Sequence, residues 1–153
     1  MFLVLTPLSD KLERVALILQ KDCECEDVLL LAEEGLHEQL QGCLQEMDIL
    51  AMASTREDET IEMIKDRHSK DCCEMFRVVF LQEALFPADT GPKNFLDALN
   101  SLFSTLGIPP PSYVLIGNAK QLQKKKNDYG VVDVVDLPLH VVYVKNAICS
   151  AIL

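Results

Sequence analysis

The sequence predicts an α/β fold in which helices cover both faces of a mainly parallel sheet, as in a three-layer sandwich. Short apolar runs of strand length alternate with segments whose apolar residues repeat at helical spacing. Most of these runs are continuously apolar, which is typical of strands buried on both faces. We find neither an internal repeat nor a Gly/Ser- or Pro-rich linker, so we expect a single domain over residues 1–153.

Seven apolar runs predict the strands. In chain order they are residues 2–6, 28–32, 49–53, 75–81, 113–117, 131–135 and 140–144. The fourth run, MFRVVFL, is rich in β-branched and aromatic residues, which suit a buried strand. Each of the first five runs is followed by a helical pattern, and this order favours parallel pairing.

Helical spacing and capping residues predict the helices. In chain order they cover residues 10–20, 36–47, 55–68, 95–106 and 119–127, and residues 145–153 form a short helix or an extended arm. Ser9 would cap the first helix, and Ser54 or Thr55 the third. Gly107 stands where the C-cap of the fourth helix belongs.

A second interpretation makes residues 27–47 one long helix. Leu29, Ala32, Leu36 and Leu40 also fit a period of 3.6 residues. This alternative would give an α+β fold instead of the three-layer sandwich.

The charge of the chain limits the classes of partner. Its net charge is −10, and residues 1–76 hold 18 acidic and 7 basic side chains against 6 and 7 in residues 77–153. Such a field repels nucleic acid and anionic lipid, so we expect no direct binding to either. We also expect neither a membrane span nor a secretory signal. The acidic first turn Glu57, Asp58 and Glu59 is a candidate surface for a basic protein partner.

The loops where a doubly wound sheet would bind a nucleotide are negatively charged, which disfavours phosphate binding. The alternation of strands and helices resembles that of Rossmann-like and GTPase-like folds in general, but the sequence lacks the nucleotide-binding motifs of those folds and would be a degenerate version of them. Residues 32–35 and 54–59 place carboxylates at helix N-termini, where they would repel a phosphate. We therefore expect no cofactor.

Two later loops are compatible with a small anion. Each has a glycine and a lysine near a helix start, where backbone N–H groups face outward. The candidate anion-binding residues are Thr90, Gly91, Lys93, Gly117, Asn118 and Lys120. They define the alternative function, a small enzyme or ligand-binding protein with a site near Lys93 and Lys120.

The cysteines predict neither a metal site nor disulfides. Cys23 with Cys25 and Cys72 with Cys73 lack the spacing of zinc ligands. A chain of this size can build its own core, so we expect reduced thiols and an intracellular protein, cytoplasmic or nuclear. Asp133 and Asp136 are interpreted as strand-end turn residues.

No catalytic signature stands out, and the C-terminal segment is apolar. The three histidines lie outside the local motifs of nucleophilic enzymes. Ile148, Ile152 and Leu153 either pack on this domain, meet a partner, or belong to a longer chain. We therefore expect a non-catalytic adaptor or scaffold module within a larger complex such as a hetero-oligomer, where it uses the acidic helix faces and this segment.

Overall fold

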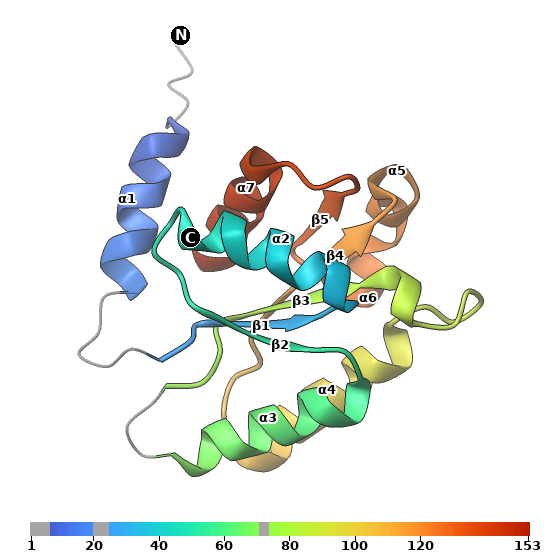
Figure 1. The fold of residues 1–153 in the computed structure, drawn as a ribbon. Helices are drawn as coiled ribbons and strands as arrows, with labels where there is room; N and C mark the ends of the chain where they lie inside the picture. Colours follow the sequence, from blue (N-terminus) through green and yellow to red (C-terminus); the bar gives the residue numbers. More distant parts are fainter. Residues whose placement is uncertain (1–6, 20–24, 71–73) are drawn as a thin grey trace, which may run out of the picture.

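Five parallel strands lie between two layers of helices (Figure 1). The computed structural model describes residues 7–19, 25–70 and 74–153. The strands are β1 (Val28–Leu31), β2 (Ala51–Ser54), β3 (Val78–Gln82), β4 (Ser112–Gly117) and β5 (Asp133–Asp136). They pair in the order β2-β1-β3-β4-β5, and every neighbouring pair is parallel. The predicted α/β class is confirmed, and the carboxyl ends of the strands meet at one edge of the sheet.

The helices divide between the two faces of the sheet. They are α1 (Leu8–Leu19), α2 (Glu34–Gln45), α3 (Glu57–Ser69), α4 (Lys93–Leu106), α5 (Ala119–Leu122), α6 (Lys126–Tyr129) and α7 (Val141–Ile152), with 3-10 turns η1 (Glu83–Leu85) and η2 (Gln123–Lys125). Buried residues of α1, α2 and α7 share one core cluster, and those of α3, α4 and α5 share the other. Figure 1 shows α2 and α7 above the sheet and α3 and α4 below it.

Alternate residues of each strand serve the two cores. In β1, Val28 and Leu30 pack with α2 and α7, whereas Leu29 and Leu31 pack with α3 and α4. All four side chains are buried. The continuous apolar run therefore reflects burial on both faces, and the interpretation of residues 27–47 as one helix is wrong. Pairing with β2 and β3 on either side holds this segment in a strand.

The last predicted strand is wrong, because residues 141–144 begin α7. Val144, Ala147 and Ile148 of this helix are fully buried against the sheet. Their spacing of three and four residues places them on one helix face, and this packing outweighs the β preference of the valines. The residues that the sequence assigned to an extended or short helical end thus belong to a helix of 12 residues.

Other predictions fail only locally. The helix expected over residues 119–127 is divided into α5, η2 and α6. Neither Ser54 nor Thr55 caps α3, because the N-cap is Arg56. The hydroxyl of Ser54 is buried, where it donates to the Leu30 carbonyl at 3.0 Å and lies 2.7 Å from Thr60 Oγ1. The strand expected at residues 2–6 lies outside the described residues. The C-cap Gly107 is confirmed, with a left-handed φ of 72°.

Candidate functional site

The crevice between β1 and β3 is the position where doubly wound sheets most often bind ligands. The chain leaves β1 toward β2 on one side, while β3 to β5 continue on the other, so the carboxyl ends of β1 and β3 flank the switch in direction. Here Gln82 Nε2 donates to Glu33 Oε1 at 2.9 Å, and Glu33 N donates to Gln82 Oε1 at 2.9 Å. Gln82 is only 3% exposed. Two hydrogen bonds within the chain thus bridge the mouth of this crevice.

Replacement of Gln82 tests this bridge. Gln82→Met removes both hydrogen bonds while keeping an unbranched side chain, and we expect it to lower the free energy of unfolding by about 1–2 kcal/mol. Gln82→Glu places a second carboxylate beside Glu33, so its cost should be larger at neutral pH than near about pH 4, where carboxylates take up protons. Urea unfolding at both pH values measures the difference. A cost for Gln82→Glu that is the same at the two pH values would contradict the bridge.

A hollow of about 440 Å³ lies at the carboxyl ends of β3, β4 and β5. We call it the carboxyl-end hollow. It is lined by Gln82, Glu83, Ala84, Ile116, Gly117, Asn118, Asp136 and Leu137. Its wall is tight at Gly117, where an added Cβ would lie 2.9 Å from Leu122 Cδ1. Glu83 and Asp136 make this hollow acidic.

The turn at residues 117–120, predicted to bind an anion, already binds a carboxylate of its own chain. Asp136 Oδ1 accepts a hydrogen bond from Ala119 N at 3.0 Å. Asn118 Oδ1 accepts from Gln121 N at 3.3 Å, so the side chain of Asn118 caps the first turn of α5. One backbone N–H of this predicted anion turn, that of Ala119, is therefore occupied by Asp136.

The other predicted anion loop is shaped by packing. Gly91 is buried with a φ of 60°, and a Cβ there would lie 2.6 Å from Tyr129 Oη. Asp89 Oδ1 accepts from Thr90 N at 2.9 Å. Lys93 is exposed on α4. Lys120 is exposed on α5, and both lysines lie outside the lining of the carboxyl-end hollow.

The predicted partner residues fall into two groups. Glu57, Asp58 and Glu59 form the first turn of α3, and Arg56 lies 3.3 Å from Asp58 and 4.0 Å from Glu59. At the other end of the chain Ile148 is completely buried in the core. Ile152 is half-buried, whereas Leu153 is exposed. The apolar end of α7 therefore packs mainly on its own domain.

The expectation of reduced thiols is wrong at one position. Cys25 is disulfide-bonded. A sequence cannot show which cysteines the fold brings together, so spacing alone could not reveal this bond. Cys43 and Cys149 are free, and burial raises the pKa of both thiols, which fits small core residues. In the described ranges we find neither a cluster of three metal-ligating side chains nor a helix able to span a bilayer.

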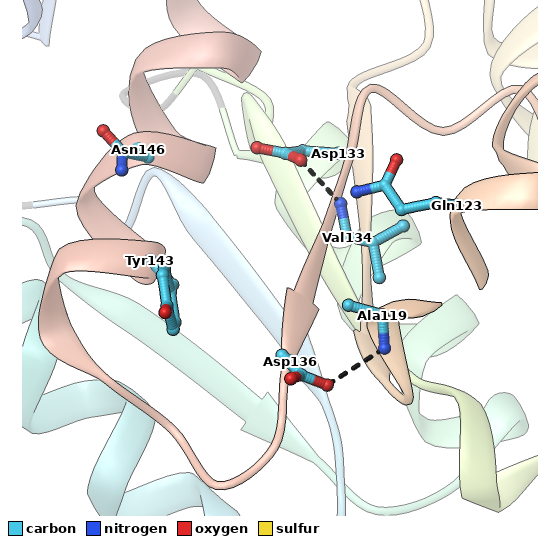
Figure 2. Close-up of a pocket in the computed structure, with 7 residues that line it drawn as sticks. All are labelled: Ala119, Gln123, Asp133, Val134, Asp136, Tyr143 and Asn146. Atoms are coloured by element: carbon cyan, nitrogen blue, oxygen red, sulfur yellow. Dashed lines mark hydrogen bonds between the residues drawn. The ribbon is translucent and has the colours of Figure 1, made fainter. Parts of the chain in front are cut away.

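A groove runs along β5, which is an edge strand of the described sheet, and Figure 2 shows its residues. It measures about 380 Å³, and we call it the edge groove. It is lined by Ala119, Gln123, Asp133, Val134, Asp136, Tyr143 and Asn146. Asp133 Oδ1 accepts from Val134 N at 2.8 Å, in addition to the bond between Asp136 and Ala119. Asp136 also lines the carboxyl-end hollow, so the two depressions meet at this residue.

Tyr143 lines the edge groove, and two other exposed apolar residues are adjacent in the chain to its lining residues, since Leu137 follows Asp136 and Val142 precedes Tyr143. Leu137 is 38% exposed, and Val142 and Tyr143 are each 51% exposed. The ring of His140 meets the Tyr143 ring edge-on, with centroids 5.6 Å apart. This surface is not apparent from the sequence, because residues 140–144 resemble a strand locally. The available signal was the helical spacing of the buried residues, which leaves Val142 and Tyr143 off the buried face.

Comparisons with known proteins identify the fold of this chain. No protein-family model and no curated protein matches the chain. Among solved structures, it is similar to a response regulator receiver domain protein from Clostridium thermocellum, with TM-score 0.63, 11% identity, and coverage of 84% of this chain and 94% of that chain. It is also similar to a Saccharomyces cerevisiae receiver domain crystallised with a histidine phosphotransfer protein, with TM-score 0.63, 13% identity, and coverage of 86% and 92%.

A third similar structure is the chemotaxis protein CheY4 of Vibrio cholerae, with TM-score 0.62, 9% identity, and coverage of 82% of this chain and 98% of that chain. Such identities establish architecture, not activity. They give no support for the expected nucleotide-binding-like character. The chain has the five-stranded parallel α/β fold of receiver domains.

Proposed function

We propose that this protein is a non-catalytic interaction module that binds another protein at the edge groove and the apolar residues beside it. The observation that carries the proposal is a groove along an edge strand that is lined by the half-exposed Tyr143, with the exposed apolar residues Leu137 and Val142 adjacent in the chain to lining residues. Exposed apolar side chains that gather beside a groove are typical of interaction surfaces. One structural neighbour was solved with a protein bound to it, which supports the same kind of role.

The carboxyl-end hollow gives phosphoryl transfer little support. Transfer of a phosphoryl group requires positive charge to balance the oxygens of the transition state. Among the described lining residues no side chain supplies this charge, and the carboxylates of Glu83 and Asp136 would supply it only through a bound cation. The hydrogen bond from Ala119 N also holds the Asp136 carboxylate in place.

The alternative, a ligand-binding protein or small enzyme near Lys93 and Lys120, is less well supported. Asp136 occupies the N–H of Ala119 that an anion would need. The interaction proposal includes a cytoplasmic or nuclear location. The disulfide at Cys25 argues against such a location, because disulfides are rare in reducing compartments.

Loss of the exposed apolar surface tests the proposal. We expect Val142→Ser combined with Tyr143→Ala to abolish recovery of the main partner when the tagged protein is purified from its native cells. Removing two half-exposed apolar side chains from an interface core should weaken the complex by at least about tenfold. Quantitative mass spectrometry of the purified material measures this loss.

The matched control removes apolar side chains from another surface. Leu17→Ser with Ile18→Ser changes two exposed residues of α1, which lie 71% and 41% exposed, and should leave partner recovery intact. Partner loss only in this control would place the interface on α1. Stable phosphorylation of the purified protein by acetyl phosphate and Mg²⁺ would contradict the non-catalytic assignment.

A further inference from the structure

We propose that the edge groove recognises a partner segment that carries two cationic side chains, arginine or lysine, beside an apolar residue. This inference rests on the proposed function and names the chemistry of the partner.

The charge of the groove favours a cation. The lining residues within the described part of the chain include the carboxylates of Asp133 and Asp136 and no lysine, arginine or histidine. Each carboxylate accepts one backbone hydrogen bond, from Val134 N or Ala119 N. An ionised carboxylate has about four acceptor positions, so each can accept further charge-assisted bonds. An anionic segment would be repelled by both.

The other lining groups also suit arginine or lysine. Tyr143 offers an aromatic ring that is half exposed, and a cation over such a ring gains a favourable electrostatic contact. Figure 2 places Tyr143 and Asn146 of α7 on one side of β5 and Gln123 on the other. The amide oxygens of Asn146 and Gln123 are additional acceptors for guanidinium or ammonium groups.

The apolar residues beside the groove complete the match. Leu137 follows the lining residue Asp136, Val142 precedes the lining residue Tyr143, and both are exposed, so a partner residue between or beside the cations can bury apolar surface there. The exposed Lys120 and Lys124 belong to neighbouring elements but lie outside the lining. The groove therefore combines carboxylates with an apolar rim, which fits an amphipathic basic segment rather than a purely apolar helix.

The strand sets the spacing of the two cations. Asp133 and Asp136 are three residues apart on β5, a separation of about 10 Å along an extended chain, and because side chains alternate along a strand they leave opposite faces of β5. An extended partner segment along this edge strand has the same rise and the same alternation, so cationic residues three positions apart can each face one of the two carboxylates. We therefore expect cations at positions i and i+3 of the bound segment.

Three labelled peptides test this inference by fluorescence anisotropy. They share one sequence with a central leucine and differ only at positions i and i+3, which hold arginine, glutamine or glutamate. We expect the arginine peptide to bind about tenfold more tightly than the glutamine peptide, and the glutamate peptide to bind most weakly. The advantage of arginine should shrink as salt is raised.

Variants of the protein locate the effect. Asp133→Asn with Asp136→Asn keeps both side-chain oxygens that accept from Val134 N and Ala119 N, and removes only the charges. It should abolish the preference for arginine over glutamine. Asp97→Asn on α4, which lies outside the lining of the edge groove, is the control with the same chemical change and should preserve the preference.

The outcomes separate this inference from the proposed function. Equal binding of the arginine and glutamine peptides, weakened by Tyr143→Ala, would overturn the cationic preference and leave the edge groove as an interface. Absence of arginine-peptide binding would also overturn the inference, while partner loss in the Val142 and Tyr143 variant would still support the interaction module. If that variant retains its partner as well, both proposals fail.

Discussion

Arg67→Met is expected to lower the free energy of unfolding by about 3 kcal/mol, because it removes a buried charge and leaves its partners unsatisfied. Arg67 lies in α3 and its side chain is only 4% exposed. A buried arginine must satisfy its charge and its N–H groups within the protein. Urea unfolding followed by circular dichroism measures the loss.

The reason is the number of segments that this guanidinium joins. Nη1 donates to the carbonyl oxygens of Glu26 at 2.7 Å and Glu74 at 3.1 Å, and Nη2 pairs with the Glu26 carboxylate. The guanidinium carbon lies 4.1 Å from the centroid of the Phe76 ring. Glu26 precedes β1, and Glu74 and Phe76 precede β3. Arg67 therefore ties the end of α3 to the amino ends of two central strands.

Arg77→Met is the matched control. Arg77 pairs with Glu74 at 3.2 Å, but both side chains are substantially exposed, so its loss should cost less than about 0.5 kcal/mol. Arg67→Lys keeps the charge but loses the forked donor geometry and should fall between wild type and Arg67→Met. If Arg67→Met were as stable as Arg77→Met, the buried arginine would not hold these segments together.

Ile148→Ala is expected to cost about 3 kcal/mol, because it would leave a cavity under α7. Ile148 is fully buried with Val144 and Ala147 in the core on this face of the sheet. The sequence alone offered Ile148 as a partner-binding residue. A large loss of stability in the isolated protein would show that its main contacts are internal.

Val142→Ala provides the comparison on the same helix. Val142 is half exposed, so its truncation should change stability by less than about 0.5 kcal/mol. Both variants are compared by urea unfolding in the absence of any partner. Similar small effects for Ile148→Ala and Val142→Ala would contradict the buried position of Ile148.

The strand and helix order could be predicted from sequence where burial and periodicity agree. VLLL is apolar at every position because β1 is covered on both faces. Helix α4 and its C-cap Gly107 could be predicted because the helical spacing of apolar residues and a glycine at a left-handed C-cap are local sequence patterns. In α7 the valines favour a strand locally, and only packing against the sheet makes the segment helical.

The candidate site was much less predictable. Asp133 and Asp136 look like ordinary turn residues in the sequence, and nothing local indicates that Asp136 reaches Ala119 N, 17 positions earlier. Gln82 and Glu33 are 49 positions apart, and their pairing exists only because β1 and β3 are neighbours. Arg67 is likewise indistinguishable from a surface arginine until the fold surrounds it.

The amino-acid sequence by itself determined the class of fold and the acidic first half of the chain, because both follow from local patterns of apolar and charged residues. The tertiary structure decided which polar groups meet. It joined Gln82 to Glu33, gave Asp136 the N–H expected to bind an anion, and brought Tyr143 beside the edge strand. The physical reason is that such contacts depend on strand order and helix packing, which bring together residues that are distant along the chain.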